Sequence, residues 1–193
     1  MKTMKTSDIG NSFLLLLLVV LSTTAQAQTN STLTAQQELE FASQLAANRP
    51  IEAGQSYWIE ELTWMEIRDL IADGTTTIII PTGGIEENGP YLTTGKHNFI
   101  LQATCPEIAK NLGNALCAPI VKFVPEGNIN PPSGSMLFPG TISLTQATYE
   151  ALLMDIASSL KQSGFTDIVL IGDSGGNQTG MANVAATLSE LWS

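Results

Sequence analysis

The chain has 193 residues, of which 44% are hydrophobic and 13% are charged. This composition is typical of a globular protein with one sizeable core and excludes a largely disordered chain. The formal net charge of −10 argues against a nucleic-acid partner, because phosphate groups repel an acidic surface. A small-molecule substrate or a cation is compatible with that charge.

The N-terminal segment has the pattern of a secretory signal peptide, which we assign to residues 1–27. Lys2 and Lys5 precede the apolar run at residues 13–21, and an Ala-x-Ala cleavage pattern follows at residues 25–27. A retained membrane anchor is the weaker alternative, because the apolar run is about half of the roughly 20 residues that span a bilayer. We therefore expect a secreted or periplasmic protein with no stable membrane anchor after cleavage.

Two regions follow this segment. Residues 28–56 are polar and form a predicted N-terminal arm, with one helical stretch at residues 34–47. Residues 57–193 form a predicted α/β domain in which helical and strand patterns alternate, which indicates right-handed crossovers and a mostly parallel sheet. Helices are expected at residues 63–73, 98–111, 145–162 and 181–192, and strands at residues 75–81, 118–124 and 166–172.

Polar loops follow the carboxyl ends of the predicted strands. Strands 75–81 and 166–172 read as continuous apolar runs, which is typical of strands buried on both faces. In open α/β sheets, ligands bind at the carboxyl edge of the strands. The loops at residues 82–98 and 125–143 have about 17 and 19 residues, and connections of this length are commonly functional. The second of them carries no independent chemical signal.

The first loop holds residue types that bind metals. Glu86 and Asn88 lie two apart, so an extended segment projects both to one side. His97, the only histidine in the sequence, returns to the same place if the chain turns at Gly95. A metal site needs such groups to converge on one ion. The alternative, a histidine that is merely hydrogen-bonded or at the surface, is the more common outcome for a single loop histidine.

The third loop contains Ser174 in the sequence GDSGG. Gly172 and Gly176 formally complete the G-x-S-x-G pattern of a nucleophile elbow, which keeps a serine hydrolase as a distant alternative. In α/β-hydrolases the catalytic histidine follows the serine, whereas His97 precedes Ser174. The antiparallel barrels of trypsin-like proteases do not fit the strand–turn–helix pattern around this serine.

Two cysteines, Cys105 and Cys117, leave two interpretations open. An oxidising compartment permits a disulfide between them, and two buried thiols are the alternative. Neither residue lies in a zinc-ligand spacing, which disfavours a cysteine metal site.

Three stretches together resemble the creatininase (creatinine amidohydrolase) family over residues 60–192. They are LTWMEIRDLIADGTTTIIIPTGGIEENGPYLTTGKHN, FPGTISLT and IVLIGDSGGNQTG. The resemblance implies a three-layer α/β/α sandwich with a mostly parallel sheet. It also implies metal-dependent hydrolysis of an amide-type C–N bond in a small-molecule substrate, with zinc or manganese as the cofactor, and a homo-oligomer.

Some of the family's metal ligands are present in this chain. Glu86 falls on the glutamate ligand and His97 on the position of the ligand aspartate. Asp173 offers a third donor. The family's later acidic ligand and its catalytic residues fall beyond Ser193, so no catalytic residue is assigned. The chain ends at LSELWS, inside a helical pattern, which indicates a C-terminally truncated chain.

Other positions depart from the family pattern. Asn88, Tyr91 and Ser174 stand where the family has histidines, and Gly176 stands where creatininase has a second glutamate. We expect Asn88, Tyr91, Ser174 and Asn177 to bind substrate or to support the metal ligands. Because of these departures, a catalytically degenerate or truncated member that retains only the fold and a ligand pocket is the main alternative to an active enzyme.

Overall fold

The computed structural model describes residues 33–193. The proposed signal peptide at residues 1–27 lies outside these residues. Contacts divide the chain into two units, residues 1–44 and 45–193. The helix expected at residues 34–47 is present as α1 (Ala35–Ala46). Within the described part of the chain, no helix combines the length and apolar character that crossing a membrane requires.

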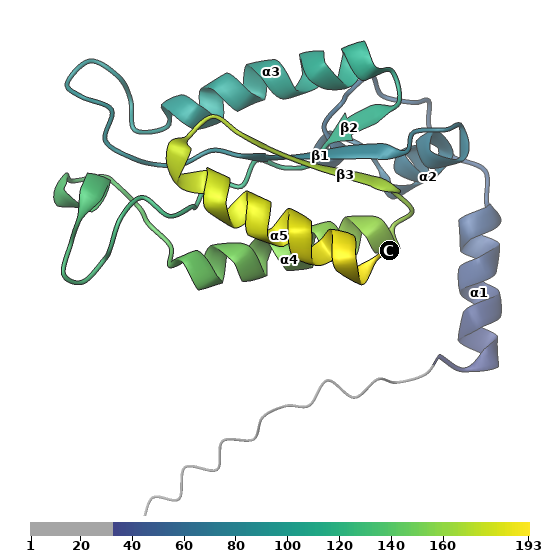
Figure 1. The fold of residues 1–193 in the computed structure, drawn as a ribbon. Helices are drawn as coiled ribbons and strands as arrows, with labels where there is room; N and C mark the ends of the chain where they lie inside the picture. Colours follow the sequence, from purple (N-terminus) through teal and green to yellow (C-terminus); the bar gives the residue numbers. More distant parts are fainter. Residues whose placement is uncertain (1–32) are drawn as a thin grey trace, which may run out of the picture. The chain divides into compact units, whose positions relative to one another are not determined.

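The second unit is built on a three-stranded parallel sheet in the order β2-β1-β3 (Figure 1). Its central strand, β1, pairs along its whole length with β3 and at three positions with β2. The strands are β1 (Thr77–Thr82), β2 (Ala115–Cys117) and β3 (Asp167–Gly172), and the helices are α2 (Trp64–Ala72), α3 (Lys96–Leu112), α4 (Gln146–Gln162) and α5 (Gln178–Leu191). Short 3₁₀ turns lie at η1 (Ile59–Glu61), η2 (Gly134–Leu137) and η3 (Gly175–Asn177).

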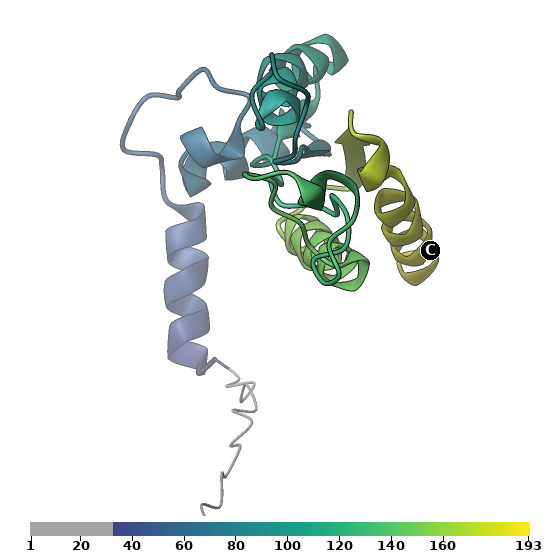
Figure 2. The same cartoon turned by 90° about the vertical axis from the view of Figure 1, so that its left-hand side faces the viewer.

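Helices cover both faces of this sheet. Side chains of a strand alternate between the two faces, so neighbouring residues of β1 pack into different clusters. Ile79 packs in a cluster with Cys105 and Ala109 of α3. Its neighbours Ile78 and Ile80 pack in a second cluster that includes residues of α2, α4 and α5. Figures 1 and 2 show α3 on one side of the sheet and α4 with α5 on the other. The α/β class and the layered arrangement expected from the sequence are therefore confirmed.

Local signals place most helix boundaries correctly. Thr63 and Glu66 form the expected capping box at the start of α2. Thr145 caps α4 by accepting a hydrogen bond from the Thr148 N–H. Helix α3 begins at Lys96, two residues earlier than expected, so His97 lies in its first turn rather than in the preceding loop. Helix α5 also begins earlier than expected, at Gln178.

Two strand predictions are wrong in detail. Strand β2 covers Ala115–Cys117, whereas residues 118–124 form only isolated bridges, such as the one between Thr82 and Val121. Pro119 has no N–H group to donate to a ladder, which explains why a regular strand does not continue there. Among residues 33–193, strand β3 lies at the edge of the sheet and pairs only with β1, so Val169 is 38% exposed and the strand is not fully buried.

The two cysteines form a disulfide bond. Cys105 in α3 is joined to Cys117 at the end of β2. The bond therefore ties α3 to the sheet on the face where Ile79 is buried.

Candidate functional site

Two amide side chains hold the backbone where β1 ends. Asn98 of α3 accepts a hydrogen bond from the Gly84 N–H at 3.2 Å and donates one to the Gly84 carbonyl at 2.9 Å. The Asn177 amide donates to the carbonyls of Thr82 and Gly83 at 2.9 and 2.8 Å. Both asparagine side chains are buried. The loop that carries Glu86 therefore starts from a fixed backbone.

The structure brings together the three residues that the sequence predicts as metal ligands. His97 Nε2 lies 2.7 Å from Glu86 Oε1, and His97 Nδ1 lies 2.9 Å from Asp173 Oδ2. The second contact is an ion-pair contact rather than a hydrogen bond, and Nδ1 has no hydrogen-bond partner. The three side chains come from the loop after β1, the first turn of α3 and the loop after β3. The side chains of His97 and Glu86 are largely shielded from solvent, with exposures of 6% and 17%, whereas Asp173 is an exposed residue whose side chain is 27% exposed.

Glu126, a residue that the sequence interpretation missed, joins this group from the loop at residues 125–143. Its carboxyl group is hydrogen-bonded to that of Glu86, and the residue is only 7% exposed. From the same loop, the Ser135 hydroxyl donates to Glu86 Oε2 at 3.0 Å. One sequence signal was available, because Glu126 is the only charged residue in the loop. We call Glu86, His97, Glu126 and Asp173 the carboxylate–histidine cluster.

The two glutamates of the cluster have pKa values shifted in opposite directions. Burial, together with the hydrogen bond and the negative charge of Glu86, raises the pKa of Glu126 to about 8. Burial also disfavours the charged form of Glu86, but hydrogen bonds with Glu126 and His97 outweigh it and lower the pKa of Glu86. At neutral pH the pair therefore holds a proton on Glu126 while Glu86 is ionised.

The other four predicted site residues have different surroundings. The Asn88 amide donates to the Glu86 carbonyl at 3.0 Å, which shapes the loop that carries Glu86. Tyr91 is 95% exposed, so its ring is almost entirely in solvent. Ser174 is buried, and its carbonyl accepts a hydrogen bond from the Asn177 N–H at 3.3 Å. Asn177 holds the end of β1, as described above, and has no exposed surface.

The donor types of the cluster fit a divalent cation. Carboxylates and an imidazole are the ligands that zinc and manganese take in proteins. Two buried polar atoms of the cluster, Glu126 Oε1 and His97 Nδ1, have no hydrogen-bond partner. Within residues 33–193, however, no three such side chains are arranged so that they could hold an ion. The donors contact one another instead, and His97 lies between two carboxylates.

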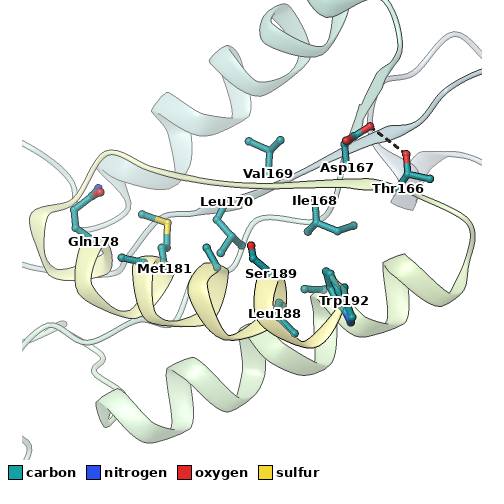
Figure 3. A pocket seen from close by; sticks show the side chains of 13 residues that line it. Thr166, Asp167, Ile168, Val169, Leu170, Gln178, Met181, Leu188, Ser189 and Trp192 are labelled. Atoms are coloured by element: carbon teal, nitrogen blue, oxygen red, sulfur yellow. Dashed lines mark hydrogen bonds between the residues drawn. The ribbon is translucent and has the colours of Figure 1, made fainter.

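A cavity of about 540 Å³ lies elsewhere, along β3 and α5. Figure 3 shows Gln178 and Met181 towards one end of it and Asp167 and Trp192 towards the other. No member of the carboxylate–histidine cluster lines this cavity. Its walls are largely apolar side chains beside the open edge of β3, so its size alone does not make it the reactive site.

Comparison with known proteins gives a consistent result. A family model described as creatininase (creatinine amidohydrolase) matches residues 60–192. The creatinine amidohydrolase of Pseudomonas putida is 29% identical over 117 residues, which is 61% of this chain and 44% of that protein. The mycofactocin precursor peptide peptidase of Mycolicibacterium smegmatis is 28% identical over 116 residues, which is 58% of this chain and 44% of that protein.

A solved structure of a mutant creatininase, described as the Zn-Zn type, has the same fold. It matches with a TM-score of 0.64 and 27% identity, over 72% of this chain and 53% of that chain. The chain thus spans less than half the length of the two curated relatives and about half of the solved structure.

Proposed function

Because the chain belongs to the creatininase family, we propose that it is a metal-dependent amidohydrolase acting on an amide-type C–N bond of a small molecule. The observation that carries this proposal is the contact of His97 with both Glu86 and Asp173. The three residues meet after the carboxyl ends of β1 and β3, which is where open parallel sheets bind their ligands.

The names of the relatives support the reaction class. One is an amidohydrolase of creatinine and another is a peptidase of a precursor peptide. Both names describe the cleavage of an amide-type C–N bond. No residue of the carboxylate–histidine cluster distinguishes a cyclic amide from a peptide as the substrate. The proposal therefore specifies the type of bond that is cleaved and not one substrate.

Glu86, His97 and Asp173 are the residues that would hold the cation. When bound, a divalent cation supplies Lewis-acid polarisation of the substrate carbonyl and lowers the pKa of a water molecule. The protein's own part is to position the donors. Ser135 and His97 hydrogen-bond to different oxygens of Glu86, which fixes the orientation of this carboxylate. Burial of His97 limits the access of bulk water to the imidazole.

A second candidate is a family member that keeps the fold and a polar pocket without catalysis. Direct contacts between the donors, and the absence of an ion-holding arrangement among residues 33–193, favour it. The exposed Tyr91 ring also stands where a family histidine is expected. The serine alternative has less support, because both ring nitrogens of His97 face carboxylates and neither is placed to take a proton from Ser174.

Metal content separates the first two candidates. The full chain and its Glu86→Ala and His97→Ala variants are stripped with a chelator and dialysed against zinc or manganese. Bound metal is then measured by elemental analysis, and hydrolysis of creatinine, formamide and short peptides is assayed. The matched control is Glu107→Ala, which removes an exposed carboxylate from α3.

We expect stoichiometric metal in the wild-type chain and in the Glu107→Ala control, and a loss of metal in both cluster variants. A metal content that is substoichiometric in the wild type and unchanged by these substitutions would favour the non-catalytic candidate. Unchanged hydrolysis in a Ser174→Ala variant would reject the serine alternative.

We also propose that the protein works outside the cytoplasm. The signal-like pattern at residues 1–27 motivates this proposal. The Cys105–Cys117 disulfide supports it, since disulfides persist mainly in oxidising compartments. Cell fractionation of the native host tests it, and recovery of the chain only from the cytoplasm would reject it.

A further inference from the structure

We propose that a second copy of this chain docks on the open edge of β3 and on the face of α5 beside it. The two copies would pair their β3 strands in antiparallel directions about a two-fold axis and join two three-stranded sheets into one. The groove at this edge is lined by no member of the carboxylate–histidine cluster. The inference is therefore independent of the proposed function.

The first argument is the hydrogen bonding of β3. All six residues of the strand pair with β1, and no other strand among residues 33–193 pairs with it. A strand paired on one side presents unpaired N–H and C=O groups along its other side, where a further strand can add. Proteins usually block such an edge with proline or with charges, but β3 holds no proline and a single charged residue, Asp167, at its start. The edge is therefore open to another strand.

The second argument is the groove beside that edge. The cavity of about 540 Å³ is lined by consecutive residues, 166–170, at the start of the strand. Because side chains of a strand alternate between its faces, consecutive residues line one cavity only where the edge of the strand itself faces it. Figure 3 shows Ile168 and Leu170 on the α5 side of the strand and Val169 on the opposite side. The groove is thus continuous with the open backbone edge.

The third argument is the composition of α5 where it forms the other wall of the groove. Exposed residues at spacings of four, three and four line this wall and share one face of the helix: Gln178, Ala182, Ala185 and Ser189. None of them is charged, and Glu190 is the only charged residue in the whole of α5, although the chain has a net charge of −10. Depletion of charge is typical of the core of a protein interface, and the small side chains allow another backbone to approach closely.

The position of Asp167 favours a second copy in antiparallel orientation. When two β3 strands pair antiparallel about Val169, Asp167 of each copy lies opposite Ile171 of the other. A parallel pairing in the same register would set the two aspartates side by side, and like charges directly opposite each other are destabilising. The two-fold axis also brings the exposed Val169 side chains together and places both α5 helices on one face of the joined sheet. The surface is thus complementary to itself, whereas it holds too few charges to attract an acidic or a basic partner.

The test compares the mass in solution of the full chain and its variants, by light scattering at low and high micromolar concentrations. Val169→Lys places a charge at the centre of the strand edge, and Ala185→Lys places one on the groove face of α5. The matched control is Ala186→Lys, because Ala186 is the next residue of the same helix, is also exposed and does not line the groove. Far-UV circular dichroism checks that each variant is folded.

Cross-linking tests the direction of the pairing. Val169→Cys sets two thiols opposite each other in the antiparallel arrangement, at a separation that a disulfide can bridge. Asp167→Cys sets them at opposite ends of the interface. Cys105 and Cys117 are already joined, so neither competes for the new thiol.

We expect the mass of two chains for the wild type and for Ala186→Lys, and the mass of one chain for folded Val169→Lys and Ala185→Lys. Mild oxidation should cross-link Val169→Cys into a dimer and should not cross-link Asp167→Cys. A wild type that stays monomeric at high micromolar concentration would overturn the proposal, whatever other segment then covers the edge. An oligomer that Ala185→Lys leaves intact, or that cross-links only through Asp167→Cys, would also overturn it.

Discussion

The carboxyl group of Glu126 is hydrogen-bonded to that of Glu86, although the two residues are separated by 40 positions in the sequence and belong to different loops. Both groups are largely withdrawn from solvent. Two carboxyl groups at this proximity cannot both be ionised without a large repulsion, so their protonation is linked to the stability of the fold.

The stability of the metal-free protein should fall as pH rises from about 4.5 to about 8. The pKa of Glu126 is about 8 in the folded chain, against an ordinary value of 4.5. Between these values the folded state binds more protons than the unfolded state, so the free energy of unfolding decreases with increasing pH. Urea denaturation in the presence of a chelator, at several pH values across this range, measures the slope.

A Glu126→Gln variant should remove this part of the pH dependence. We expect the variant to be more stable than the wild type at pH 8.5 and to differ little from it at pH 4.5. Parallel stability curves for the two proteins would contradict the assignment of the titration to Glu126.

Loss of the Asn177 amide should destabilise the fold. An Asn177→Ala variant leaves the buried carbonyls of Thr82 and Gly83 without their donor, and we expect a loss of about 3 kcal/mol. An Asn177→Asp variant should be no better, because a carboxylate cannot donate to a carbonyl. The control is Asn183→Ala, an exposed residue of α5, the helix that follows Asn177. Equal urea midpoints for the variants at positions 177 and 183 would rule out this role.

The disulfide should contribute about 3 kcal/mol to stability, the value for a short closed loop of about 13 residues. We expect a lower melting temperature for the wild type under reducing conditions and for a Cys105→Ser/Cys117→Ser double variant. A reductant should have no further effect on the double variant. The prediction fails if reduction leaves the melting temperature of the wild type unchanged.

Adjacent glycines in the loop after β3 should respond differently to alanine. A Cβ atom at Gly176 would lie 2.7 Å from the Pro125 carbonyl oxygen, whereas a Cβ atom at Gly175 would meet nothing within 4 Å. Gly176→Ala should therefore destabilise the protein by about 1 to 3 kcal/mol. Gly175→Ala should change its stability little. Similar thermal melts for the two variants would show that the segments can separate at low cost.

The sequence predicted the central features of the fold because they depend on local patterns. The isoleucine run of β1 and the capping box of Thr63 and Glu66 are examples, and both are present in the structure. The prediction of a strand at residues 118–124 was wrong because it relied on the apolar composition of the segment. It did not take into account that Pro119 has no N–H group to donate to a neighbouring strand. The burial of β3 was overestimated because a sequence does not reveal which strand lies at an edge.

The candidate site was only partly accessible from the sequence. Glu86 and His97 lie within one loop and its adjoining helix, so their proximity follows from a short separation. Glu126 lies in a loop rich in glycine, proline and asparagine, and only the packing of that loop against Gly84 and Gly176 brings its carboxyl group to the cluster. A contact between segments that are distant in the sequence leaves no periodic pattern from which a single sequence would predict it.

The amides of Asn98 and Asn177 have a consequence for any acid titration of this protein. They bind the backbone at Thr82, Gly83 and Gly84 through groups that neither gain nor lose a proton over the working range of pH. The two amides that hold the backbone beside the carboxylate–histidine cluster thus keep the same charge over the pH range in which the cluster itself changes charge. If a bound cation were lost on acidification, the loss would reflect protonation of the cluster side chains and not unfolding of the backbone that carries them.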